Sequence, residues 1–209
     1  MKNILLLSST KFLREHPSPI PGKSLREMRI AYVTTASKGV SDLTYLERTK
    51  GIFAQNGYNY TELDIDGKTQ EWLENYLKDF DAVYVQGGNS FYLLKAIRES
   101  GFDSVIKKLL PEGFVYIGAS AGSYVACPTI EMTGFKHQDK YDHCGVTDLT
   151  AMGLVPFLMS VHYSPEYKDV LKESIPAASL PVKILTDDQA ILIQDDKVEL
   201  VGDGEEIRV

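Results

Sequence analysis

The sequence is poor in cysteine, because only Cys127 and Cys144 occur among its 209 residues. Two cysteines cannot build the disulfide framework of a small secreted protein, so we expect a reducing compartment. No apolar stretch approaches the roughly 20 residues of a membrane-spanning helix. The apolar run at residues 4–7 is too short for the core of a signal peptide and is followed at once by "KFLREH". We therefore expect a cytoplasmic globular protein with no membrane partner.

An excess of basic residues is also missing, since the net charge is −7 at pH 7. Without a basic face to offset phosphate charge, a nucleic-acid partner is not expected. No G-x-G-x-x-G or H-E-x-x-H motif occurs, and His137, His143 and Cys144 lack a metal-ligand spacing. We therefore expect no metal and no cofactor. The length fits one domain spanning residues 1–209.

Apolar strand-like segments alternate with amphipathic segments along the chain. Strands are predicted at residues 3–9, 29–35, 58–65, 81–89 and 114–117, and a closing set at 182–186, 190–194 and 197–202. Helices are predicted at 42–57, 69–80, 90–101 and 165–174, with the aromatics of 69–80 in the core and residue 89 or 90 as a helix cap. Residues 131–153 are polar and predicted as a loop. This alternation favours an α/β fold with a mostly parallel sheet and helices on both faces, whose ligand site lies at the carboxyl ends of the strands.

One strand end carries an unusual sequence, Gly118-Ala119-Ser120-Ala121-Gly122. Four small residues around one hydroxyl fill a core poorly, but they suit a strand–turn–helix elbow in which a larger side chain would collide. Such an elbow presents the Ser120 hydroxyl as a nucleophile and aims the Ala121 amide at a developing oxyanion. The alternative is a tight structural turn with a capping serine.

A serine nucleophile needs a base and a carboxylate that orients the base. Of the four histidines, His162 is the best candidate because it ends the apolar run "VPFLMSVHY" just before a predicted helix, whereas the others lie in polar loops (His16, His137, His143). The pair Asp187-Asp188 ends a predicted strand and is the best-placed source of the carboxylate. The rival acids all lie in the polar loop (Asp139, Asp142, Asp148).

Three segments together, "QGGNSFYLL", "GASAGSYVACPTI" and "VHYSP", resemble the dipeptidase E (aspartyl dipeptidase) family. That family is related to cyanophycinase, and its sheet is similar to that of class I glutamine amidotransferases. The resemblance implies a serine peptidase acting on small peptides, with Ser120 as nucleophile and His162 as base. It also implies that the Gly88 amide is a second oxyanion donor beside Ala121. In the same loop, Asn89 is expected to contact the substrate.

Two departures from the family pattern affect these expectations. The position fifteen residues after the serine, where one family pattern has the triad aspartate, is Phe135. The other family pattern has the acid at the end of a late strand, which favours Asp187 over Asp188. The stretch after the histidine contains Lys168 and Lys172 but no arginine, so a strict preference for N-terminal aspartate is not implied.

Two other functions stay open from the residues alone. A small esterase of the α/β-hydrolase type would use Ser120, Asp148 and His162 in that chain order. A non-catalytic amidotransferase-like binding module would keep the elbow without chemistry. For the peptidase we expect a monomer or a homodimer.

Overall fold

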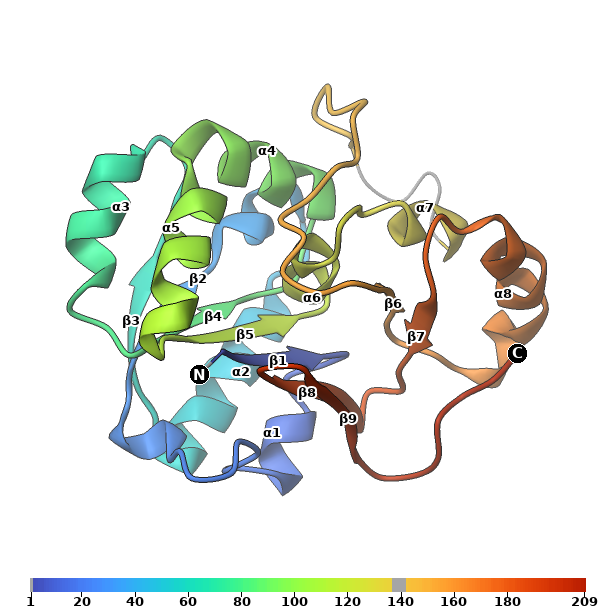
Figure 1. The fold of residues 1–209 in the computed structure, drawn as a ribbon, viewed down its shortest axis with the longest axis horizontal. Coiled ribbons are helices and arrows are strands. Elements are labelled where there is room, and N and C mark those ends of the chain that lie inside the picture. The colour runs from blue at the N-terminus through green and yellow to red at the C-terminus, as the bar shows by residue number, and fades with distance from the viewer. Residues whose placement is uncertain (1, 137–141) are drawn as a thin grey trace.

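The computed structural model describes residues 2–136 and 142–209. Its main sheet has seven strands in the order β3-β2-β4-β5-β1-β8-β9 (Figure 1). The first five strands of this order run parallel, and β8 and β9 are antiparallel to their neighbours. The strands are β1 (Asn3–Leu7), β2 (Arg29–Val33), β3 (Asn59–Leu63), β4 (Ala82–Val85), β5 (Val115–Ala119), β8 (Gln189–Gln194) and β9 (Lys197–Gly202). The predicted α/β class with a mostly parallel sheet is confirmed.

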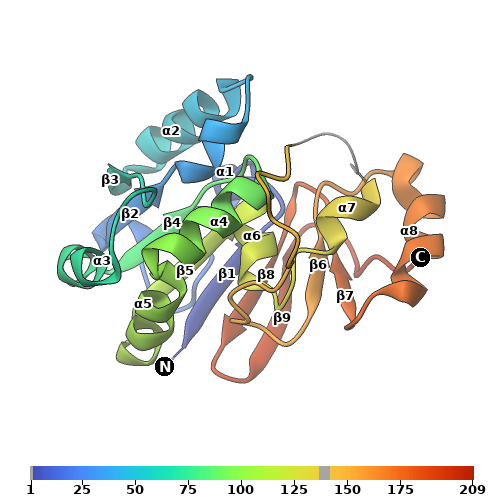
Figure 2. The same ribbon diagram turned by 90° about the horizontal axis from the view of Figure 1, so that it is seen from above.

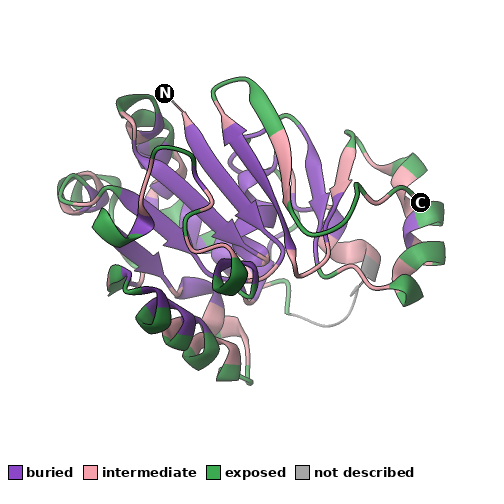
Figure 3. Cartoon of the chain, turned by 90° about the horizontal axis from the view of Figure 1, so that it is seen from below, coloured by how far each residue is buried: buried purple, intermediate pink, exposed green. Residues whose placement is uncertain are grey.

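Helices cover both faces of this sheet, as Figure 2 shows from above. Alternating side chains of β1 separate two cores, with Leu5 and Leu7 in one and Ile4 and Leu6 in the other. On the first face lie α1 (Phe12–Glu15) and α2 (Thr44–Asn56), and on the second lie α3 (Gln70–Leu77), α4 (Ser90–Ser100), α5 (Phe102–Leu109) and α6 (Ala121–Ala126). Short 3-10 turns occupy Leu25–Glu27, Thr35–Gly39, Leu110–Glu112, Pro165–Tyr167 and Ile175–Ala177. The central strands are buried on both faces, which explains their continuous apolar sequences (Figure 3).

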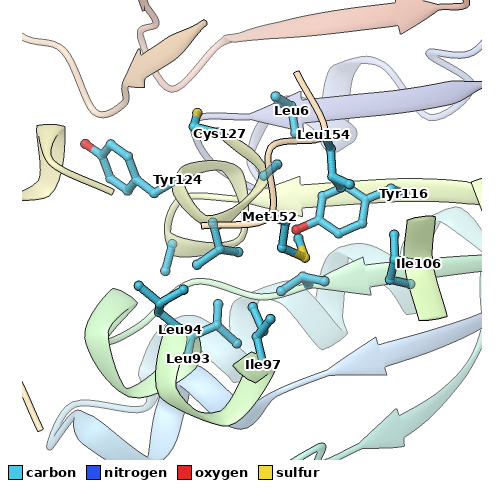
Figure 4. Close-up of a cluster of buried hydrophobic side chains, with 14 of the residues drawn as sticks. Leu6, Leu93, Leu94, Ile97, Ile106, Tyr116, Tyr124, Cys127, Met152 and Leu154 are labelled. Atoms are coloured by element: carbon cyan, nitrogen blue, oxygen red, sulfur yellow. The ribbon is translucent and has the colours of Figure 1, made fainter. Parts of the chain in front are cut away.

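The core on the second face is built from α4, α6 and the strands beneath them. Figure 4 shows Leu93, Leu94 and Ile97 of α4 on one side of this core, with Tyr116 of β5 and Met152 nearby. Met152 belongs to a segment after α6 that hydrogen-bonds back to that helix, its amide donating to the Val125 carbonyl at 3.0 Å. This segment helps to bury the short helix that follows the serine elbow.

One predicted core residue lies on the surface. Trp72 of α3 is 39% exposed, whereas Leu73 and Leu77 are fully buried. Because α3 has only two turns, it presents a narrow apolar stripe to the sheet, and Trp72 lies outside that stripe. Its ring stacks on Tyr76 with centroids 4.6 Å apart and carries the Lys68 ammonium 4.5 Å above it.

A second, smaller sheet lies beside the first. It pairs β6 (Leu158–Ser160) with β7 (Val182–Ile184) in parallel and is flanked by α7 (Met132–Lys136) and α8 (Lys168–Ser174) (Figure 1). Part of the predicted loop 131–153 is therefore helical. Met132 is buried against the core even though its neighbours are polar, and this burial explains why the polar sequence did not indicate the helix. None of the helices in the described ranges combines the length and apolar character that a membrane crossing requires.

Candidate active site

The turn after β5 holds Ser120 in a strained conformation. Its φ of 52° and ψ of −110° lie in a region that non-glycine residues rarely adopt, at a cost on the order of 1–3 kcal/mol. The turn is possible because its neighbours are small: a Cβ on Gly122 would collide with the Val85 carbonyl, and one on Gly118 would meet the Gly122 backbone. The structure thus has the elbow geometry that the glycine spacing predicted.

His162 and Asp187 continue from Ser120 as one hydrogen-bonded chain. The His162 Nε2 atom lies 2.9 Å from the Ser120 hydroxyl oxygen, and its Nδ1 atom lies 2.6 Å from Asp187 Oδ1. His162 follows β6 and Asp187 follows β7, so the parallel pairing of these strands brings both residues to one edge. The Tyr163 amide, which donates to the Leu185 carbonyl at 2.9 Å, fixes the two loops to each other.

Ser8 supports this arrangement, and the sequence had not indicated it. Its fully buried hydroxyl donates to Asp187 Oδ1 at 2.9 Å and accepts from the His162 amide at 2.7 Å. His162 has a φ of 55°, and the contact with Ser8 stabilises this strained backbone. The sequence shows only that Ser8 follows the first strand. The strand order, with β1 between β5 and β8, places the residue after β1 beside the turn that follows β5.

The carboxylate of Asp187 is electrostatically suited to stay ionised. Partial burial acts to raise its pKa, but hydrogen bonds from His162 and Ser8 and the charge of Lys11 outweigh that effect. The net pKa of Asp187 is therefore lowered. Its neighbour Asp188 points elsewhere and pairs with the Lys11 ammonium at 2.8 Å.

Two backbone amides flank the serine. Ala121 is the first residue of α6, and the first amides of a helix have no acceptor within it. Gly88 has a φ of 144°, and a Cβ there would collide with the Ala36 carbonyl, so the loop after β4 requires glycine. A Cβ on Gly87 would come within 2.9 Å of the Ser120 Cβ, which means that this loop packs directly against the elbow.

These residues face a cleft of about 670 Å³ at the carboxyl ends of the central strands. Ser120, His162, Asp187 and Gly88 all line it. The opposite walls come from the starts of α1 and α2 and the loop before α2 (Thr10, Lys11, Arg14, Asp42, Tyr45, Arg48). The cleft therefore lies at the sheet edge where the α/β pattern predicted a ligand site.

The rival histidines and acids within the described residues lie away from His162. His16 stacks on Phe12, and His143 stacks on Phe91 with ring centroids 4.0 Å apart. Asp148 pairs with Arg98 at 3.4 Å, and Asp142 accepts from the Cys144 amide at 2.8 Å. The Asp148 site expected for an α/β-hydrolase-type esterase is thus not assembled. His137 and Asp139 lie outside the described residues.

Asn89 does not reach the cleft, contrary to the expected contact with substrate. Its side chain is fully buried, and its oxygen accepts from the Phe91 and Tyr92 amides as the cap of α4. Its amide nitrogen donates to the Asp142 carbonyl at 2.8 Å. With both ends of the carboxamide engaged, Asn89 positions the loop after Gly88 and the segment after residue 141.

Comparisons with known proteins show the family to which the chain belongs. The model of peptidase family S51 matches residues 4–201. An uncharacterised peptidase of Listeria innocua is 29% identical over 95% of each chain, and a peptidase E of a Nostoc species is 26% identical over 96% of this chain and 86% of its own. A crystal structure of a peptidase E protein from Listeria monocytogenes superposes with a TM-score of 0.83 at 26% identity, covering 98% of this chain and all of that one. The chain belongs to peptidase family S51, a family of serine peptidases.

Proposed function

We propose that this chain hydrolyses short peptides through an acyl-enzyme formed on Ser120. The observation that carries the proposal is the chain of hydrogen bonds at 2.6 Å and 2.9 Å from Asp187 through His162 to the Ser120 hydroxyl. An ionised carboxylate at Nδ1 favours the imidazole tautomer whose proton is on that nitrogen. Nε2 is then free to accept the serine proton.

In the proposed first step, Ser120 Oγ forms a bond to the peptide carbonyl carbon as its proton moves to His162 Nε2. The electron pair of the carbonyl moves to its oxygen, and the amides of Ala121 and Gly88 donate hydrogen bonds to that oxyanion. Collapse of the intermediate breaks the C–N bond, and His162 gives its proton to the departing amine. Water then attacks the acyl-enzyme with His162 as base, which releases the acid and restores Ser120.

The size of the cleft supports small peptides, and its basic side chains suit peptides that carry a carboxylate. A volume of about 670 Å³ is in the range of small-molecule sites, which suits a dipeptide or tripeptide. Lys168 and Lys172 of α8, which follow the histidine in the chain, are not among the lining residues. The cations that do line the cleft are Lys11, Arg14 and Arg48, and Lys11 is already paired with Asp188.

We also propose that residues 1–209 act as a single catalytic domain. In the site, Ser8 follows the first strand and Ser120 follows the fifth, whereas His162 and Asp187 lie in the loops after the strands of the small sheet. A division of the chain anywhere between Ser8 and Asp187 would separate groups that the mechanism requires together.

A serine-directed fluorophosphonate probe and a substrate panel test the proposal. The wild-type protein should be labelled at Ser120 and should release amino acids from dipeptides, whereas Ser120→Ala should do neither. Labelling without peptide turnover but with rapid turnover of simple esters would favour an esterase. Absence of both labelling and turnover would favour a binding module.

A further inference from the structure

A buried glutamine forms part of the floor of the cleft and takes no part in the mechanism above. Gln86 follows β4 directly, is only 4% exposed, and still lines the cleft. Along β4, Tyr84 points to the face covered by α1 and α2. The strand alternation therefore directs Gln86 toward the same face, beneath the walls formed by α1 and α2.

Hydroxyl groups lie beside the oxygen end of the Gln86 carboxamide. Thr49 Oγ1 lies 3.5 Å from Gln86 Oε1 and 3.1 Å from Thr10 Oγ1, and Thr10 lies 2.6 Å from the Tyr84 hydroxyl. These groups are all buried beneath the cleft. The network occupies the oxygen end of the carboxamide, whereas no hydrogen-bond acceptor for its nitrogen is found among residues 2–136 and 142–209.

An amide donor without a partner is costly where water is largely excluded. The Gln86 side chain is almost entirely buried, but its nitrogen is not sealed in the interior and faces the cleft that the residue lines. A bound ligand that brings a hydrogen-bond acceptor to this point would satisfy the donor, and an apolar ligand would leave it unsatisfied. The floor of the cleft therefore offers a bound ligand a hydrogen-bond donor.

The strand order indicates which part of a peptide reaches Gln86. Ser120 follows β5, which lies between β4 and β1 in the sheet. Ser8, after β1, holds His162 and Asp187 on one side of the nucleophile. Gln86, after β4, lies on the other side. Because His162 protonates the departing amine, the leaving residue lies on the β1 side. Gln86 therefore lies on the side of the residue that becomes the acyl group.

We propose that Gln86 is a specificity-determining residue whose amide donates a hydrogen bond to the side chain of the substrate residue preceding the scissile bond. This inference rests on the proposed peptidase function. It adds an uncharged hydrogen-bond donor to the part of the cleft that receives the side chain of this residue. Since the donor is uncharged, it serves a carboxamide and a carboxylate alike, unlike an arginine clamp.

Gln86→Met tests this role because methionine has a similar length and no hydrogen-bond donor. The assay measures kcat/KM for Asn-Ala, Asp-Ala and Leu-Ala, whose first residues differ mainly in the acceptor. We expect the Asn-Ala to Leu-Ala ratio and the Asp-Ala to Leu-Ala ratio each to fall by about 10- to 100-fold in the variant. Gln70→Met, the same change on exposed α3, is the matched control and should leave both ratios unchanged.

Gln86→Glu provides a second variant if methionine disturbs folding. A carboxylate in place of the carboxamide should reduce turnover of Asp-Ala more than that of Asn-Ala, because like charges repel. Ratios within twofold of wild type in Gln86→Met, or an equal effect of Gln86→Glu on both acceptors, would overturn the proposal.

Two further readouts separate this inference from the peptidase function. Fluorophosphonate labelling of Ser120 in the Gln86 variants reports whether the nucleophile still works. Calorimetric binding of Asn-Ala and Leu-Ala to Ser120→Ala protein, with and without Gln86→Met, reports recognition without turnover. Loss of the Asn-Ala preference in binding supports the role of Gln86 even where turnover fails. Equal binding of both peptides by Ser120→Ala refutes it.

Discussion

Replacing Asp187 by asparagine tests the charge of the proposed orienting carboxylate, because the side chain keeps its shape. Asp187 Oδ1 is 2.6 Å from His162 Nδ1 and 2.9 Å from the Ser8 hydroxyl. An asparagine that keeps its oxygen at this point no longer stabilises the imidazolium formed during attack. One that turns its NH₂ group toward Nδ1 forces the proton onto Nε2, which then cannot accept from Ser120. In serine triads this loss is about 10⁴-fold in kcat, or about 5 kcal/mol in activation free energy.

Asp188→Asn is the matched control for this change. Asp188 pairs with Lys11 at the surface, where the two side chains are 44% and 52% exposed. Such pairs contribute about 0–1 kcal/mol, so kcat should stay within about threefold of wild type. Stopped assays on one dipeptide at saturation measure both variants, and circular dichroism checks their folding. A kcat for Asp187→Asn within tenfold of wild type, or a more severe defect in Asp188→Asn, would refute the assignment of the carboxylate.

Three further predictions concern the same site. Ser120→Gly should have a free energy of unfolding about 1 kcal/mol higher than that of Ser120→Ala, because only glycine relieves the strain of the positive φ. Equal urea midpoints for the two variants would contradict the strain. Ser8→Ala should lower kcat by about 10- to 100-fold with little change in KM, since its hydroxyl positions His162 and Asp187 without lining the acyl side; a change confined to KM would count against that role. Asp187 has a lowered pKa, so its contacts stabilise the fold above the pKa of about 3.9 of an unfolded aspartate and lose that effect as the pH falls through the folded value. Between pH 5 and pH 3, urea unfolding should therefore show a steeper loss of stability for wild type than for Asp187→Asn, and parallel curves would contradict it.

Local patterns made much of the fold and part of the site predictable. The strand–Ser–helix turn is encoded within five residues, since Gly118 and Gly122 make the backbone approach possible. His162 is predictable because it ends an apolar run, a property that can be read without knowing the partner strands. The sequence predicts residue 89 or 90 as the cap of α4, and the structure shows that Asn89 is the cap.

Other features depend on contacts that the sequence pattern does not contain. Asp187 and Asp188 are neighbours beyond a three-residue strand, too short for its alternation to assign their directions. The bond between Ser8 and His162 spans 154 residues and exists only because β1 lies between β5 and β8. The Gln86 carboxamide lies beside Thr49, which contacts Thr10, and both threonines come from other parts of the chain. Contacts between residues far apart in the sequence decided each of these positions.

The central position of β1 also bears on how the protein is made. The first strand is paired by β5 on one side and by β8 on the other, and the hydroxyl after it contacts His162 and Asp187. A chain growing on the ribosome carries Ser8 and Ser120 long before the segment with Asp187 has been synthesised. In the proposed mechanism Ser120 requires His162 and Asp187, so a nascent chain that lacks this late segment does not yet contain the complete site. The strand order thus couples assembly of the proposed site to docking of the segment that carries Asp187.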